Sequence, residues 1–137
     1  NRRTVSLPAT EDVTVGRALA AYPRETYVLG TKVGFPIGPP PNNAGLSRKH
    51  VLEQCHASLR RLQLDYVDLL FCHRPDPDTP LEETLSAVAA AVRQGKAIYA
   101  GISNYSAAQT REACSILRDL GCPCLIHQPK YSMYERW

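Results

Sequence analysis

The sequence predicts an α/β protein with a parallel β-sheet, and three observations support this fold class. Helix-like and strand-like patterns alternate along the chain, four of each. The strand-like runs are short and rich in β-branched or apolar residues, as in strands buried on both faces. Successive strands are separated by about 25 to 40 residues, which suits right-handed βαβ crossovers. An open doubly wound sheet and an arc of a (β/α)8 barrel both fit this pattern.

The first two predicted elements are a helix and a strand. Val15 and Leu19 recur at helical spacing, and Pro23 ends that helix. Residues 27–32 form a short run of β-formers. A proline-rich loop follows over residues 36–41.

Capping signals mark the later helices. Ser47 can cap a helix whose apolar stripe leads to a continuous apolar strand at 67–72. Residues 79–82 combine a capping box with proline at the first helical position, opening a helix that runs to Gly95. A strand follows at 97–102. The next helix begins with a capping box formed by Ser106 and Gln109 and stops at Gly121, and the last strand covers 124–128.

Composition excludes several classes of protein. The 137 residues are 44% hydrophobic and 21% charged, with a net charge of +3, which is ordinary for a globular domain. No run of five like charges suggests nucleic-acid or membrane-surface binding. No stretch approaches the roughly 18 apolar residues that a membrane span needs, and no apolar run marks a signal peptide.

The thiols and imidazoles do not predict a metal site. Four of the five cysteines lie inside predicted elements, which favours free thiols and a cytoplasmic location. The four histidines, at positions 50, 56, 73 and 127, show no metal-ligand spacing. We therefore expect no bound metal.

Polar residues stand at the carboxyl end of every predicted strand, where α/β folds place their sites. Lys32, His73, the pair Ser103-Asn104, and Gln128 occupy these positions. Each alone has a structural explanation: a surface lysine, a packed histidine, turn-forming residues and a capping amide. Together they favour a polar site. The sequence contains no Rossmann fingerprint, no P-loop and no nucleophile elbow that would define the chemistry further.

Four motifs resemble the aldo-keto reductases in order and spacing. They are residues 27–34, residues 62–76 ending in His-Arg-Pro-Asp, residues 101–106 and residues 126–128. The resemblance covers nearly the whole chain from about residue 13 onward. It looks closest to the branch that contains potassium-channel beta subunits and bacterial glyceraldehyde-3-phosphate-type reductases.

The resemblance implies a TIM barrel that moves a hydride between NADP(H) and a small carbonyl substrate. Lys32 matches the lysine that lowers the pKa of a catalytic tyrosine, and His73 matches the histidine that orients the substrate carbonyl. Ser103, Asn104 and Gln128 match residues that hydrogen-bond the nicotinamide carboxamide. The resemblance carries over no metal ligand.

The match has a limit at its amino-terminal end. The family's catalytic tyrosine precedes the position of Val15, and residues 1–14 contain no tyrosine. We therefore divide the chain into an atypical segment, 1–14, and a partial reductase domain, 15–137, with about four of eight βα units. An alternative is a non-catalytic partial barrel or an interaction module of the channel-beta type. Pairing with a second copy to complete the barrel is a further expectation.

Overall fold

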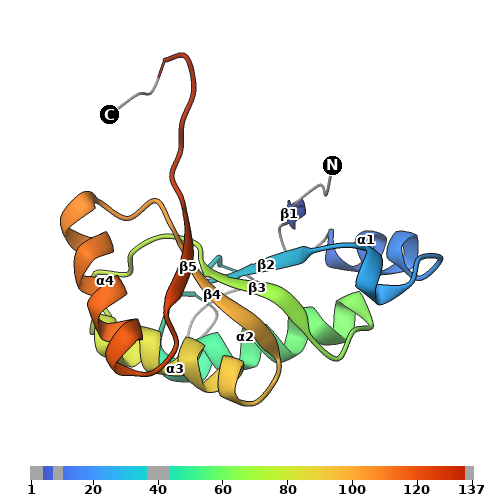
Figure 1. Cartoon of the computed structure of the whole chain (residues 1–137), viewed down its shortest axis with the longest axis horizontal. Coiled ribbons are helices and arrows are strands. Elements are labelled where there is room, and N and C mark those ends of the chain that lie inside the picture. The colour runs from blue at the N-terminus through green and yellow to red at the C-terminus, as the bar shows by residue number, and fades with distance from the viewer. Residues whose placement is uncertain (1–4, 8–10, 37–43, 135–137) are drawn as a thin grey trace.

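The computed structural model describes residues 5–7, 11–36 and 44–134, which form one parallel sheet with helices packed on it (Figure 1). The loop predicted at residues 36–41 lies almost entirely outside the described residues. The strands are β1 (Val5–Leu7), β2 (Leu29–Val33), β3 (Val67–Cys72), β4 (Ala97–Ser103) and β5 (Cys124–Gln128). The helices are α1 (Asp12–Leu19), α2 (Arg48–Leu62), α3 (Leu81–Arg93) and α4 (Ala107–Asp119), with a short 3-10 turn, η1 (Arg24–Thr26).

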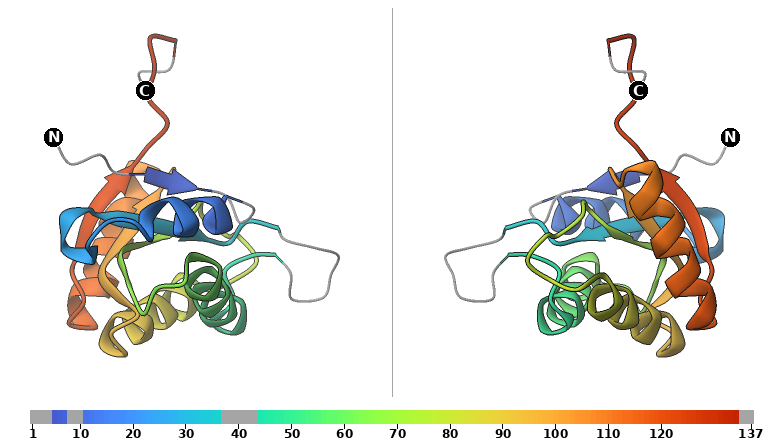
Figure 2. Two further views of the ribbon diagram at one scale, coloured as in Figure 1. Left: turned by 90° about the vertical axis from the view of Figure 1, so that its right-hand side faces the viewer. Right: turned by 90° about the vertical axis from the view of Figure 1, so that its left-hand side faces the viewer.

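The order of the strands decides between the two architectures that the sequence pattern allowed. All pairings are parallel, and the strands lie in chain order from β1 to β5. A doubly wound sheet reverses its strand order at a switch point, whereas a barrel adds each strand beside the previous one. The described sheet therefore has the order of a barrel arc, and Figure 2 shows the helices gathered on one side of it.

The main core lies between this helix layer and the sheet. Alternate residues of β3, Leu70 and Cys72, join the buried cluster, together with Val51 of α2, Leu85 of α3 and Leu117 of α4. Apolar residues at a spacing of 3 and 4 line one face of each helix, and those at a spacing of 2 line one face of the strand, so these faces pack together. The apolar stripes therefore determine which face of the sheet the helices cover.

The opposite face of the sheet packs differently. Phe71 is only 2% exposed, and its ring lies against glycines on both neighbouring strands. A Cβ built on Gly101 of β4 would come within 2.6 Å of the ring, and one built on Gly30 of β2 within 3.0 Å. These two glycines allow the ring to lie close against the backbone. Farther along this sheet, several side chains of β4 and β5 remain exposed: Ile98, Tyr99, Leu125 and Ile126.

Two predicted caps are confirmed, and one is wrong. The Ser47 side chain accepts a hydrogen bond from the His50 N–H, and Ser106 and Gln109 form the expected capping box. The third helix begins at Leu81, so Pro80 is not its first residue as predicted, and Thr79 does not cap it. Pro80 takes the cap position with no side-chain bond, because the Thr79 hydroxyl donates instead to Asp76 at 2.8 Å.

Three other findings concern the predictions made from the sequence. The strand β1 lies in the segment that we read as atypical, so the described sheet has five strands and not four. No helix in the described part of the chain is long and apolar enough to cross a bilayer. All five cysteines are free, as expected.

Candidate functional site

The five predicted site residues come together at the carboxyl edge of the sheet. The last paired residues of β2 and β3 are Val33 and Cys72, and the His73 N–H extends this ladder by donating to the Val33 carbonyl at 3.0 Å. On the other side, Ser103 pairs with Gln128 at the ends of β4 and β5. Parallel pairing in chain order brings all four strand ends to one edge, and this convergence is what the sequence predicted.

Lys32 and His73 form the first half of the site. Lys32 lies on β2 in register with Phe71, and burial lowers the pKa of its ammonium group. Burial also lowers the pKa of His73, and the positive charges of Lys32 and Arg74 lower it further. The ordinary pKa of histidine is near 6.5, so the His73 imidazole is neutral at pH 7. The site thus presents a neutral imidazole beside an ammonium group.

His73 also has a buried ring atom without a partner. Among the described residues, nothing hydrogen-bonds its Nδ1, which is inaccessible to solvent. The Phe35 ring packs on the imidazole with the ring centroids 5.4 Å apart and the planes tilted by 44°. Sequence analysis did not single out Phe35. Its position just after β2 is the only signal that could have suggested it.

Asn104 ties the second half of the site together. It adopts a left-handed backbone conformation with φ of 59°, which asparagine tolerates better than most residues. Its Nδ2 donates to the His73 carbonyl at 3.4 Å and to the Ser103 hydroxyl at 3.2 Å. Its Oδ1 accepts from the Lys130 N–H at 3.0 Å. Asn104 therefore joins the ends of β3 and β4 to the segment after β5.

Ser103 and Gln128 differ in how much of their hydrogen-bonding capacity is used. Ser103 is buried, and its hydroxyl donates to the Gln128 carbonyl at 2.8 Å. The Asn104 N–H donates to the same carbonyl at 3.3 Å. The Gln128 side chain is exposed, and in the described part of the chain no hydrogen bond involves its amide. Gln128 thus offers donors and an acceptor to a ligand, while Ser103 mainly fixes the backbone.

Asp76, in the loop after β3, organises the approach to this edge. Its carboxylate accepts hydrogen bonds from the Leu46 N–H at 2.6 Å, the Asp78 N–H at 3.0 Å and the Thr79 hydroxyl at 2.8 Å. Burial alone would raise its pKa, but these bonds hold the pKa below its ordinary value. Beside it lies a hollow of about 260 Å³ lined by residues 34, 36, 44–46 and 74–78. The carboxylate therefore fastens the loop after β3 to the start of α2.

Tyr27, Tyr66 and Tyr105 lie within two residues of the ends of sheet strands. Tyr27 and Tyr66 both lie against the Arg24 guanidinium. Their ring centroids are 4.9 and 4.2 Å from its central carbon atom. Tyr105 is buried, and burial together with the Cys72 thiol raises the pKa of its hydroxyl. None of these three hydroxyls is poised as a proton donor at the carboxyl edge.

The described residues include no group of three or more His, Cys, Asp or Glu side chains that could hold a metal ion. They do suit a carboxamide and a carbonyl. A nicotinamide carboxamide has one acceptor and two donors, which the unpaired Gln128 amide can satisfy. The neutral imidazole of His73 can donate one hydrogen bond to a carbonyl oxygen. The donor set thus fits a nicotinamide cofactor and a carbonyl compound.

A parallel sheet in barrel order with such an edge is typical of a (β/α)8 oxidoreductase. The aldo/keto reductase family model matches residues 9–137, and the chain belongs to this family. A thermostable aldo-keto reductase, Tm1743, solved as a crystal structure with the inhibitor epalrestat, superposes with a TM-score of 0.79 and 35% sequence identity. That match covers 93% of this chain and 42% of the other. The described arc is thus part of a TIM barrel of the aldo-keto reductase type.

Two curated relatives add detail. L-glyceraldehyde 3-phosphate reductase from Escherichia coli (strain K12) is 44% identical over 134 residues, covering 95% of this chain and 38% of the relative. A probable voltage-gated potassium channel subunit beta from Arabidopsis thaliana is 48% identical over 115 residues, covering 82% of this chain and 34% of the relative. The chain thus spans well under half the length of the curated relatives it matches.

Proposed function

We propose that this chain forms the central part of an NADP(H)-dependent oxidoreductase that reduces an aldehyde or ketone to an alcohol. The observation that carries the proposal is the carboxyl edge itself. There a neutral His73 with an unpartnered ring nitrogen lies beside Lys32, and the unpaired Gln128 amide stands on the same edge. Membership of the aldo/keto reductase family supports a hydride-transfer reaction at this edge.

The cofactor would supply a hydride from its reduced nicotinamide ring. Gln128 would hold the carboxamide with its side-chain amide, and Asn104 would align it from the end of β4. Ser103 would act mainly through its hydrogen bond to the Gln128 carbonyl, which fixes the height of Gln128 along the edge. Fixing the carboxamide selects the ring face that points to the substrate.

Lys32 and His73 would serve the carbonyl group. A neutral imidazole can donate one hydrogen bond to the carbonyl oxygen and so set its orientation. Lys32 would lower the pKa of a tyrosine proton donor, because a nearby cation favours the phenolate. That tyrosine would come from another part of the complete barrel, since segment 1–14 contains none.

The same family evidence supports a proposal for the substrate class. The Escherichia coli relative is named for L-glyceraldehyde 3-phosphate, a small aldehyde. A small carbonyl compound is therefore the proposed substrate. The loop after β3 and the start of α2, joined through Asp76, would form part of its pocket.

A second candidate is a non-catalytic interaction module. Relatives from Arabidopsis thaliana and Oryza sativa subsp. japonica, 48% and 45% identical, are named as probable potassium channel beta subunits. In this case the edge would bind the cofactor without turnover. Cofactor binding without consumption of NADPH in the presence of aldehydes would favour this candidate.

The exposed apolar side chains of β4 and β5 bear on the state of assembly. Ile98 and Tyr99 of β4, together with Leu125 and Ile126 of β5, the last strand of the described sheet, are 42–56% exposed. Unpaired edges with apolar side chains favour association. We therefore propose that a second copy covers this edge when the chain is isolated.

The test is a fluorescence titration of the purified chain with NADPH, with size-exclusion chromatography in parallel. We expect saturable binding by a defined oligomer. Gln128→Ala removes one or two hydrogen bonds of about 1 kcal/mol each, so affinity should fall roughly 5- to 30-fold. Gln94→Ala, which changes an exposed glutamine at the end of α3, should leave affinity unchanged. Equal affinities for all three proteins, or no binding by folded chain, would refute the proposed cofactor site.

A further inference from the structure

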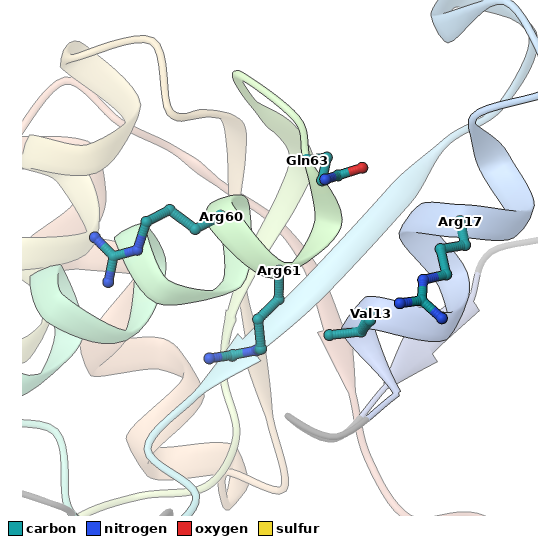
Figure 3. A pocket seen from close by; sticks show the side chains of 5 residues that line it. All are labelled: Val13, Arg17, Arg60, Arg61 and Gln63. Carbon is teal, nitrogen blue, oxygen red and sulfur yellow. The ribbon is translucent and has the colours of Figure 1, made fainter.

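A second polar hollow lies between α1 and the end of α2, and we propose that it binds a small phosphate-type oxyanion. The hollow has a volume of about 200 Å³ and is lined by Val13, Arg17, Arg60, Arg61 and Gln63. Figure 3 shows Val13 and Arg17 on α1 facing Arg61 and Gln63 across the gap, while Arg60 extends along α2 in the opposite direction. Its lining residues include three arginines and a glutamine, and no acidic residue.

The walls of this hollow are held by close packing of the two helices. Gly16 of α1 is buried against the end of α2, where a Cβ would come within 2.5 Å of the Leu62 carbonyl oxygen. Gln63 ends α2 in a left-handed conformation with φ of 56°, which turns the chain beside the hollow. The close contact of Gly16 with the Leu62 carbonyl therefore sets how near α1 lies to the end of α2.

Arg61 is held in place by groups of the protein. Its guanidinium donates to the Asp12 carboxylate at 2.9 and 3.1 Å and to the Ser58 hydroxyl at 3.0 Å. Asp12 is 2% exposed, so this ion pair is shielded from solvent on the carboxylate side. The pair positions Arg61 at the wall of the hollow and neutralises one of the three positive charges.

The remaining two charges are uncompensated. In the part of the chain that the structure describes, neither Arg17 nor Arg60 takes part in a hydrogen bond or an ion pair. The side-chain amide of Gln63 is exposed beside them. The hollow thus presents unpaired N–H donors from Arg17 on α1 and Gln63 at the end of α2, while Arg60, which points away from the gap, adds only its positive charge (Figure 3).

This donor set suits an oxyanion with several acceptor oxygens. A guanidinium group binds phosphate or carboxylate through two parallel N–H···O bonds, which a lysine cannot do. The volume is below the roughly 300–1,000 Å³ of clefts that take drug-sized ligands. Inorganic phosphate, or the phosphate group of a small metabolite, is therefore the ligand class that matches the hollow.

Helix dipoles explain only part of this arrangement. Arg17, Arg60 and Arg61 all lie in the last turns of their helices, where positive charge is favourable. The dipole of a single helix does not explain why donor groups of α1 and α2 lie on two sides of one hollow. The hollow is also separate from the candidate active site, because the end of α2 leads into the amino end of β3 and His73 follows its carboxyl end. The proposal therefore does not rest on the proposed reductase function.

The test is isothermal titration calorimetry of the 137-residue chain with inorganic phosphate at low ionic strength. Backbone amide shifts, followed by NMR, map the site. We expect saturable binding, with shifts centred on Val13 and Gln63. Arg17→Gln should weaken binding about tenfold, as expected for loss of a charge-assisted hydrogen bond. Arg111→Gln, which changes an exposed arginine of α4, should have no effect.

Three results would overturn the proposal. The first is the absence of saturable binding to folded chain. The second is equal weakening by both substitutions, which would indicate a general attraction of anions to a basic surface. The third is a set of shifts centred on Asn104 and Gln128, which would assign the phosphate to the edge proposed for the cofactor.

Discussion

The contact between Phe71 and Gly101 allows a quantitative test of how the sheet is packed. In Gly101→Ala, the new methyl group would lie 2.6 and 2.7 Å from two carbons of the Phe71 ring, against an optimum of about 3.5–4.0 Å. The ring would have to move by about 1 Å, and overpacking of this kind costs about 1–3 kcal/mol. Replacing glycine in a strand regains about 0.5–1 kcal/mol. We expect a net loss of about 1–2 kcal/mol in the free energy of unfolding.

Urea denaturation followed by circular dichroism measures this loss. For a domain of this size, the expected loss corresponds to a midpoint shift of about 0.5–1 M. Gly30→Ala is the matched control, because its methyl group would meet the same ring at 3.0 Å and should cost much less. The double variant Phe71→Leu/Gly101→Ala should be less destabilised than the sum of the single changes. Equal costs for the two glycines, or strict additivity with Phe71→Leu, would refute the packing account.

Three further predictions concern single side chains. Asp68 accepts a hydrogen bond from the Leu29 N–H at 2.8 Å and pairs with Arg24 at 2.6 Å. Asp68→Ala should therefore lower the free energy of unfolding by about 2–3 kcal/mol in urea denaturation, and Asp68→Asn by about half as much. A loss below about 1 kcal/mol for the alanine variant would contradict this. The pKa of Asp76 is lowered in the fold, so its contribution is present above the unfolded value near 3.9 and is lost as pH falls through the folded pKa. The stability difference between the parent chain and Asp76→Asn should therefore shrink to zero in acid, and a constant difference would contradict it. Burial raises the pKa of the Cys72 thiol to about 12, so this thiol should resist a disulfide reagent at pH 8 until the chain is unfolded, and rapid labelling in the folded chain would count against the fold.

Local signals predicted most of the secondary structure. Ser47 and Ser106 cap helices because a hydroxyl needs only N–H groups two or three residues away, so these caps can be recognised in a short window. Thr79 failed as a cap because Asp76 competes for its hydroxyl. The strand β1 was missed because three residues show no measurable periodicity, and its existence depends on pairing with β2.

The candidate site was predictable in position and less so in connectivity. The topology rule alone brings Lys32, His73 and Gln128 to one edge. The hydrogen bonds that link Asn104 to the His73 carbonyl and to the Lys130 N–H join residues 31 and 26 positions apart, and no local pattern encodes such contacts. The choice of a barrel over an open sheet likewise required the strand order, which is a property of the whole chain.

The central claim is that the carboxyl edge of the sheet binds a nicotinamide cofactor. The most direct measurement follows the side-chain amide signals of Asn104 and Gln128 by NMR as NADPH is added to the folded chain. The account predicts that both signals shift with one saturation curve, and that Gln128→Ala moves this curve to higher NADPH concentration. Shifts confined to Arg17 and Gln63, with the two edge amides unchanged at saturation, would contradict it.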